Sequence, residues 1–313
     1  INIVTKKGAP GPAQFETEAS GTSGFNKSDD LSSRISQSVS GGTDRVYGRL
    51  GISGEQNKAF YDGKGDQIFI DNTQTDLQYN RTLDLMGSLA IKLDDVQDLD
   101  LLAQYYDSGN NGNTGLYFPN LHDKAPSNLE DAEIRSGYHT DLEPRSKRLL
   151  FNANYHHSDL LGQDFYLQGS YRKEDNNFFP FPYYNAGKPQ GANGVYFAAS
   201  QQNFEVTSLK ALFAKQWDSV KLTYGVDLDR ERFNATQSVF NSAISSESGG
   251  LDLDTQSKAP RYPSYRVDGH SVYAQADWKL TDALTLSGGA RRQQMDVDVG
   301  VFKGIPGGSN DYA

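Results

Sequence analysis

The sequence contains no cysteine and only five histidines among its 313 residues. Without cysteine, the chain can form neither a disulfide framework nor a cysteine-based metal site. The adjacent His156 and His157 would point to opposite faces of a strand, so they cannot chelate one metal ion together. The acidic segment from Asp62 to Asp66 lacks the ligand spacing and the closing glutamate of an EF-hand calcium loop. We therefore expect no protein metal site and no resident cofactor.

Long apolar runs and an excess of positive charge are also missing. The net charge is −10, and the mean hydropathy is −0.66. No window approaches the roughly 18 consecutive apolar residues of a transmembrane helix. An acidic chain lacks the basic footprint that nucleic-acid binding requires. Serine-hydrolase, zinc-protease and phosphate-loop patterns do not occur either, so we expect neither a nucleic-acid partner nor an enzyme.

Strict alternation of side-chain polarity is the strongest pattern that is present. In residues 270–291, apolar or small side chains occupy every second position, and Thr281 and Asp282 interrupt the pattern once. A period of two puts the two sets on opposite faces of a strand, and the short break predicts a hairpin. Asp277 and Lys279 mark the face that meets water. Each arm has roughly 10 residues, the length of a tilted strand that crosses a bilayer.

Such strands are typical of outer-membrane barrels, but a soluble β-sandwich shows the same alternation. The spacing of the strands favours the barrel. Short turns alternate along the chain with long polar segments, as short periplasmic turns alternate with long extracellular loops in outer-membrane barrels. Loops beyond about 15 residues are uncommon in compact soluble domains. The predicted long loops cover residues 57–80, 109–145, 176–203 and 235–267, and a short strand is expected at 68–70.

These patterns predict an all-β fold, a transmembrane antiparallel up-and-down β-barrel with about 11 strands. A complete single-chain bacterial barrel has an even number of strands. About 11 strands are half of the roughly 22 strands of the plugged transporters. The chain also opens without methionine and without a signal peptide, in the middle of a strand-like pattern. We therefore expect a fragment, about half of a 22-stranded plugged barrel.

Three segments resemble the TonB-dependent receptors of the bacterial outer membrane. INIVTKKG at residues 1–8 looks like the last strand of the plug domain of that family. HSVYAQADWKLTDALTLSGGARRQQ at residues 270–294 is similar to a mid-barrel segment of the family. Together with YGVDLDRERFNATQSVFN at residues 224–241, it resembles the siderophore-receptor branch. The resemblance implies that residues 1–8 end a plug domain, and that residues 9–313 are the N-terminal half of the receptor barrel.

Within that branch, residues 60–87, 103–112 and 261–265 look closest to receptors for ferric aerobactin and related citrate–hydroxamate siderophores. The resemblance implies a receptor that takes up a ferric siderophore with energy supplied by TonB–ExbB–ExbD through a plug that this chain largely lacks. Iron would arrive as the siderophore chelate. The implied surroundings are outer-membrane lipid, and the full-length protein would be a monomer. The alternatives are a general-diffusion porin or structural barrel, an outer-membrane lipase or protease, and the soluble sandwich.

Aromatic density in the third predicted loop marks the candidate ligand site. Exposed apolar clusters usually form binding surfaces, and arginine suits the recognition of carboxylate or hydroxamate oxygens. The alternative is that these aromatics pack the loops onto themselves or lie in the membrane-interface girdle, and that Arg261 forms a salt bridge within its loop. The candidate ligand-binding residues are Tyr117, Phe118, Phe181, Tyr183, Tyr184, Lys188, Tyr196, Arg261, Tyr262 and Tyr265.

Two further sets of side chains are expected to serve the barrel itself. Aromatic residues near strand ends are typical of the interface belts of membrane barrels, and we assign this position to Trp217, Trp278, Tyr155 and Tyr171. Charged residues on the polar faces of the strands are expected to be lumen-wall groups that hydrogen-bond a plug. These are Lys92, Arg172, Lys221, Asp227, Asp277 and Lys279.

Overall fold

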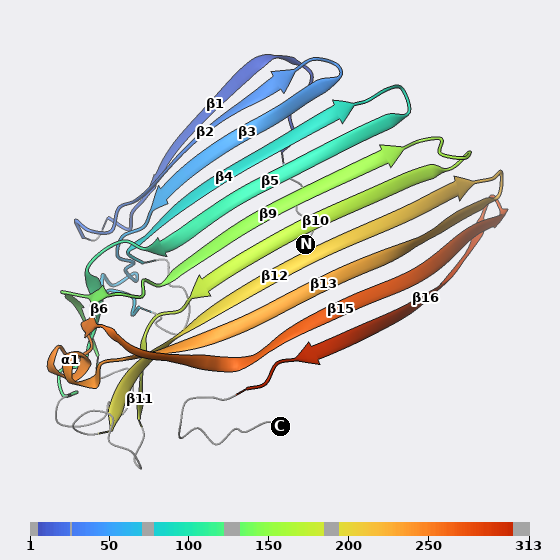
Figure 1. Ribbon diagram of the computed structural model, residues 1–313. Coiled ribbons are helices and arrows are strands. Elements are labelled where there is room, and N and C mark those ends of the chain that lie inside the picture. Colours follow the sequence, from blue (N-terminus) through green and yellow to red (C-terminus); the bar gives the residue numbers. More distant parts are fainter. Residues whose placement is uncertain (1–5, 26, 71–77, 122–131, 185–193, 303–313) are drawn as a thin grey trace.

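The computed structural model describes residues 6–25, 27–70, 78–121, 132–184 and 194–302. Its main feature is one large sheet of long strands (Figure 1). Among the described residues, no helix is long and apolar enough to cross a membrane. The main strands are β1 (Gly11–Thr22), β2 (Ser32–Gly42), β3 (Val46–Gln56), β4 (Asn80–Lys92), β5 (Gln97–Asn110), β9 (Arg145–His157), β10 (Asp164–Asn177), β12 (Val195–Gln216), β13 (Val220–Phe240), β15 (Thr255–Thr281) and β16 (Leu284–Val299).

Each main strand pairs antiparallel with the next one along the chain. The order across the sheet is β1-β2-β3-β4-β5-β9-β10-β12-β13-β15-β16, so the colours in Figure 1 run from blue to red without a crossover. A short strand, β11 (Phe181–Tyr184), adds to β12 as the twelfth member. The predicted up-and-down antiparallel topology is therefore confirmed. Within the described residues, β1 and β16 form the two edges of the sheet, so the sheet is open.

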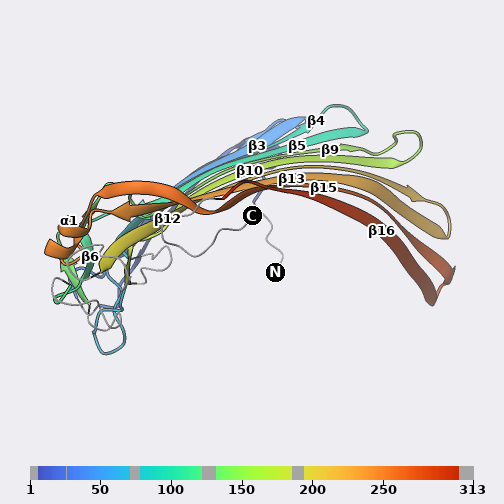
Figure 2. The ribbon, with the colours of Figure 1, turned by 60° about the horizontal axis from the view of Figure 1, so that its bottom comes forward.

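The sheet is bent into an arc (Figure 2), and the side chains on its two faces differ in chemistry. Lys7 donates to Asp100 at 2.8 Å and Lys6 donates to Glu16 at 3.2 Å. The N-terminal segment lies on the concave side of the arc, so Asp100 and Glu16 mark the concave face. Because strand side chains alternate, their neighbours Leu99 and Leu101 belong to the convex face. The convex face exposes large apolar side chains, among them Phe15, Ile35, Leu50, Ile52, Leu83, Leu85, Leu149, Phe151, Leu209, Leu228, Val272 and Leu286.

Short and long connections lie at opposite ends of the strands, as the sequence predicts. The short turns cover residues 43–45, 93–96, 158–163, 217–219 and 282–283, and the long connections cover 23–31, 57–79, 111–144, 178–194 and 241–254. The first turn depends on Gly42, whose φ is 145°. A β-carbon at Gly42 would approach the carbonyl oxygen of Val46 to 2.2 Å, so only glycine fits this turn.

The strands extend further into the loop end than the sequence predicts. The predicted loop at 235–267 is wrong, because β13 continues to Phe240 and β15 begins at Thr255. The sequence of these strand ends shows no regular alternation of apolar and polar residues, so it carries no clear strand signal. Pro260 and Pro263 also resemble loop signals. The strand predicted at residues 68–70 is absent, and an isolated bridge joins Tyr61 to Gln67 instead.

An aromatic row crosses four strands near the short-turn end. Tyr155, Phe165, Phe213 and Tyr224 follow one another on β9, β10, β12 and β13, with ring centroids 6.3, 4.7 and 5.5 Å apart. Trp217 and Trp278 lie at the same end, and their side chains are 50% and 48% exposed. Such a girdle is where aromatic side chains meet a membrane interface. Tyr171 pairs with Phe151 and Thr207 and does not belong to this row.

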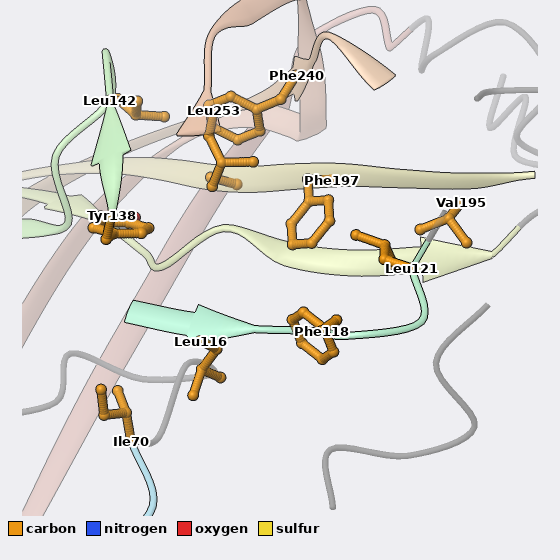
Figure 3. Packing of buried hydrophobic residues seen from close by; sticks show 11 residues of the cluster. Ile70, Leu116, Phe118, Leu121, Tyr138, Leu142, Val195, Phe197, Phe240 and Leu253 are labelled. Atoms are coloured by element: carbon orange, nitrogen blue, oxygen red, sulfur yellow. The ribbon is translucent and has the colours of Figure 1, made fainter. Parts of the chain in front are cut away.

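At the opposite end, the long loops share a small hydrophobic core (Figure 3). It joins β6 (Thr114–Tyr117), β7 (Glu133–Ser136), β8 (His139–Thr140), α1 (Ser242–Glu247) and β14 (Asp252–Leu253) to the ends of β12 and β13. Phe118 meets Phe197 edge-to-face at 6.1 Å. Each large apolar side chain that is fully buried here contributes about 1.5–3 kcal/mol. The cluster, called the loop core below, contains Ile70, Leu116, Phe118, Leu121, Tyr138, Leu142, Val195, Phe197, Ala199, Phe240 and Leu253.

Candidate functional site

Four aromatic side chains form a patch on the concave face, between the loop core and the short-turn end of the strands. Phe233 lies at its centre, with ring centroids 4.8 Å from Phe204, 5.1 Å from Tyr265 and 6.4 Å from Tyr262. Phe204, Phe233 and Tyr265 are partners in cross-strand register on β12, β13 and β15. Phe233 shares its face with Asp227, which belongs to the concave wall. We call Phe204, Phe233, Tyr262 and Tyr265 the aromatic patch.

A β-bulge brings the two tyrosines of β15 to the same side. Residues three apart on a regular strand point to opposite faces. In β15, Tyr265 pairs with Phe233 and Tyr262 pairs with Ala235, so three steps along β15 match two steps along β13. The extra residue of the bulge reverses the alternation. Pro263 lies inside it, where a strand tolerates the missing amide donor.

A second aromatic group lies beside the loop core. Tyr183 on β11 stacks on Tyr196 of β12 at 5.5 Å, and Phe181 meets Tyr183 edge-to-face at 5.5 Å. Val195 and Phe197 point into the loop core. Tyr196 lies between them in the strand and therefore faces away from the core.

Arg261 joins the two aromatic groups. Its guanidinium carbon lies 5.5 Å from the ring centroid of Tyr262. Burial raises the pKa of Tyr196, and the charge of Arg261 is near enough to oppose part of that rise. The Nε atom of Arg261 is buried and has no hydrogen-bond partner among the described residues. The alternative considered from the sequence, a salt bridge within its loop, is not found in the described part of the chain. A guanidinium that has an aromatic neighbour and an unpaired Nε within the described residues suits an anionic ligand with apolar surface.

Below the patch, the concave wall carries a compact charge network. Asp227 contacts Arg291 at 2.7 Å and Lys210 at 3.8 Å, and Ser271 donates to it at 3.3 Å. Asp227 is nearly buried between these cations. All six charged residues predicted for the lumen wall share this face, namely Lys92, Arg172, Lys221, Asp227, Asp277 and Lys279. Contact of these groups with a plug stays a prediction.

Polar contacts also tie the first long loops together. Tyr61 donates to Asp29 at 2.8 Å, and burial, with the nearby Asp29, raises the pKa of Tyr61 to about 12. The carboxylate of Asp62 accepts the amide N–H groups of Lys64 and Asp66 at 2.9 Å. These bonds, with that of Asp66 first, lower the pKa of Asp62. Asp62 therefore closes a turn on itself.

Comparison with known proteins decides the family. A family model described as "TonB dependent receptor-like, beta-barrel" matches residues 86–312. The chain belongs to the TonB-dependent receptor family. The rhizobactin receptor of Rhizobium meliloti (strain 1021) is 37% identical over 308 residues, which cover 97% of this receptor chain and 40% of the relative. The ferric aerobactin receptor of Klebsiella pneumoniae is 36% identical over 333 residues, which cover 100% and 44%.

Solved structures show the same fold. The ferric citrate transporter FecA in its unliganded form matches with a TM-score of 0.59 at 17% identity, over 92% of this receptor chain and 38% of that chain. The ferripyoverdine receptor of the outer membrane of Pseudomonas aeruginosa matches with a TM-score of 0.60 at 17% identity, over 94% and 38%. The receptor chain thus spans about two fifths of the length of its relatives, 40% in the first case. The predicted all-β antiparallel fold, the family and the outer-membrane localisation are confirmed, whereas closure of the sheet into a 22-stranded barrel stays a prediction.

The structure brings six of the ten predicted site residues into one neighbourhood. They are Phe181, Tyr183, Tyr196, Arg261, Tyr262 and Tyr265.

The other four predicted residues have different positions. Phe118 is only 3% exposed and packs in the loop core, so here the structure favours the packing alternative. Tyr117 lies under the guanidinium of Arg135, whose carbon is 3.9 Å from its ring centroid. Tyr184 pairs through its backbone with Val195. Lys188 lies outside the described residues. The role of all ten residues in ligand binding stays a prediction.

Sequence reasoning missed Phe204 and Phe233. The signal for Phe233 was an aromatic residue at a polar position, because Asp227, Asp229 and Glu231 precede it on the same face of β13. Phe204 gave no comparable signal, since residues 176–203 were interpreted as a loop that ended just before it. Its position became visible only through its cross-strand partner Phe233.

Proposed function

We propose that this receptor chain is the N-terminal half of the barrel of an outer-membrane transporter that takes up a ferric siderophore, of the aerobactin-like citrate–hydroxamate class. The observation that carries the proposal is Arg261, a cation without a carboxylate partner in the described part of the chain, set between two aromatic groups at the long-loop end. The relatives that match nearly the whole chain at 37% and 36% identity are named for rhizobactin and ferric aerobactin.

The proposed chemistry is recognition without bond making. A ferric chelate of citrate and hydroxamate groups presents anionic oxygens on a partly apolar body. Arg261 donates to those oxygens, because its planar guanidinium matches carboxylate-like pairs of acceptors. Phe233 and Tyr262 pack against the apolar parts of the chelate. Tyr183, Tyr196 and Lys188 belong to the same proposed site. Iron remains coordinated by the siderophore, so the protein supplies no ligand to the iron and no catalytic step.

Transport requires parts beyond the ligand site. We propose that residues 1–8 end the plug domain and that residues 9–313 belong to the barrel. The contacts of Lys6 with Glu16 and of Lys7 with Asp100 support this division, because they hold the start of the described chain against the concave wall. TonB–ExbB–ExbD would displace the plug, the convex face would contact lipid, and the full-length receptor would act as a monomer.

Substitutions at Arg261 test this proposal in cells that lack their own receptor and are given the full-length protein. A charge-assisted hydrogen bond contributes about 1.5–3 kcal/mol, so Arg261→Gln should weaken binding of ferric aerobactin by roughly one to two orders of magnitude. Arg261→Lys should recover part of this loss, since it keeps the charge without the planar fork. Phe233→Ala should also weaken binding. Uptake of radiolabelled iron from ferric aerobactin is the measurement.

The matched controls lie on the opposite face of the sheet, Arg266 on the same strand as Arg261 and Phe151 on β9. Arg266→Gln removes an arginine of β15 that pairs with Asp268 on the convex face, 3.0 Å away. Phe151→Ala removes an exposed convex aromatic. Both should leave uptake unchanged. Equal uptake by Arg261→Gln, Phe233→Ala and the unmodified receptor would contradict the proposed site.

A further inference from the structure

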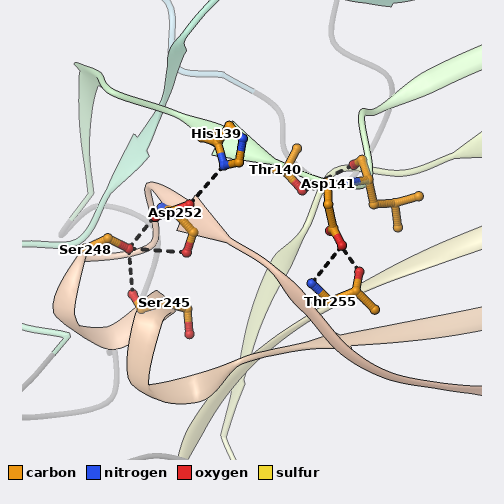
Figure 4. Close-up of polar contacts among 8 residues, drawn as sticks. His139, Thr140, Asp141, Ser245, Ser248, Asp252 and Thr255 are labelled. Carbon is orange, nitrogen blue, oxygen red and sulfur yellow. Dashed lines mark hydrogen bonds and ion pairs between the residues drawn. The ribbon is translucent and has the colours of Figure 1, made fainter.

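Three potential metal ligands meet on the outer side of the loop core, away from the aromatic patch. They are the imidazole of His139 and the carboxylates of Asp252 and Asp254, and one donor atom from each lies within 4.8 Å of the other two. His139 comes from the connection at residues 111–144, whereas both aspartates come from the connection at 241–254. The group therefore joins two loops that are far apart in sequence (Figure 4).

The backbone fixes these three side chains in place. β8 and β14 pair in parallel, with His139 directly opposite Asp252, and the amide of His139 donates to the carbonyl of Leu251 at 2.8 Å. Leu253, between the two aspartates, is buried in the loop core. Asp252 and Asp254 must therefore both face outward.

Hydrogen bonds also hold the ends of the paired strands β8 and β14 in place. Asp141 accepts hydrogen bonds from the amide and the hydroxyl of Thr255, at 3.0 and 2.9 Å. Ser248 accepts the amide of Asp252 at 2.9 Å. The side chains of His139 and Asp254 remain exposed. The donors are thus held on a rigid support with an open side.

The charge of this group is not balanced within the described structure. The imidazole Nδ1 of His139 lies 3.0 Å from the carboxylate of Asp252, but no lysine or arginine among the described residues forms an ion pair with Asp252 or Asp254. Other carboxylates of the loop end do have such partners, as Asp107 has Arg145 at 2.5 Å. Two neighbouring carboxylates repel each other, and a bound cation would remove that cost.

We propose that His139, Asp252 and Asp254 bind one divalent transition-metal ion of the zinc class. One imidazole nitrogen with two carboxylate oxygens suits Zn²⁺ or Co²⁺ at about 2.0–2.2 Å. Calcium prefers roughly six to eight oxygen ligands and rarely coordinates imidazole. The side chains are exposed, so small rotations close the 4.8 Å spread around an ion, and water fills the remaining position. The ion would fasten the two loops together outside the ligand site.

Zinc titration of the full-length receptor in detergent tests this proposal. The protein carries no polyhistidine tag and is first stripped with a chelator. Isothermal titration with Zn²⁺ should show one site, and Co²⁺ should give a visible absorption band. Loss of an outer-shell partner alone costs roughly 10–100-fold in metal affinity, so His139→Ala and the isosteric Asp254→Asn should each lose at least that much. His157→Ala, at the last residue of β9 near the short-turn end, should bind as the parent does.

A second readout separates metal binding from a folding defect. Zn²⁺ should slow hydrogen exchange of the amides in β8 and β14 in the parent but not in Asp254→Asn, while both proteins exchange alike without metal. Equal zinc affinity in the parent and both ligand variants would overturn the proposal. Binding of Ca²⁺ in preference to Zn²⁺ would also overturn it, because it would remove the role of His139.

Discussion

Arg261 carries more of the functional argument than any other single residue. A guanidinium remains charged at every accessible pH, so an Nε that is buried without a partner among the described residues carries a desolvation cost. The ring of Tyr262 offsets part of this cost through a cation–π contact. A ligand oxygen would offset the rest. The same reasoning distinguishes Arg261 from Arg266 and Arg230, which already share Asp268.

The carboxylate of Asp62 gives a test at the scale of one residue. Backbone N–H groups, that of Asp66 first, hold its pKa below the ordinary value of 3.8. A lowered pKa in the folded state stabilises the turn above the ordinary pKa, and this stabilisation is lost as pH falls through the lowered value. Hydrogen exchange of the Asp66 amide, corrected for its intrinsic rate, should therefore accelerate below pH 3.8.

Two substitutions make that test specific. Asp62→Asn keeps an oxygen acceptor for the two amides but cannot titrate, so it should remove the acid-dependent acceleration. Asp62→Ala should expose the Asp66 amide at every pH. An acid dependence that persists in Asp62→Asn would show that another group controls the turn.

At the scale of the element, the sequence predicts strands well wherever two different solvents face them. β4 and the β15–β16 hairpin are predicted from alternation, because one face of each strand is apolar or small and the other is polar. The parts of β13 and β15 at the long-loop end are not predicted as strands, because polar and apolar residues are mixed on both of their faces. The bulge that aligns Tyr262 with Tyr265 depends on the pairing with β13, and β13 is not a neighbour in sequence. Two of the four residues of the aromatic patch, Tyr262 and Tyr265, are therefore predictable from residue types. The contacts that bring the four side chains together are not.

The packing of the loop core leads to a second prediction at the scale of the element. Phe240 is fully buried at the end of β13 and packs with residues of three other connections. Removing a buried phenylalanine side chain costs about 3–5 kcal/mol. Phe240→Ala should therefore speed hydrogen exchange in β6, β8 and β14 while leaving the short-turn end unchanged. Leu161→Ala, at a position 87% exposed, is the matched control. Unchanged exchange in Phe240→Ala would mean that the loops are held independently of the core.

At the scale of the whole molecule, the open sheet needs pairing partners for its two edge strands. Within the described residues, β1 and β16 each leave one row of backbone groups unpaired, and unpaired groups are not tolerated in lipid. We therefore expect residues 1–313 alone to show no ligand-dependent iron uptake after reconstitution into liposomes. The full-length receptor, tested in parallel, should bind its ligand and should take up iron when TonB supplies energy. Ligand-gated uptake by residues 1–313 alone would contradict the half-barrel account.

The most direct test of the account is a calorimetric titration of the full-length receptor in detergent. Ferric aerobactin, ferrichrome and cobalamin are titrated in parallel. Heat is preferred to tryptophan fluorescence, because Trp217 follows β12 and Trp278 lies near the end of β15, whereas Arg261 lies near the start of β15. The account predicts saturable binding of ferric aerobactin at sub-micromolar concentration and none of the other two. Preference for ferrichrome would change the siderophore class, and binding of cobalamin alone would contradict siderophore uptake itself.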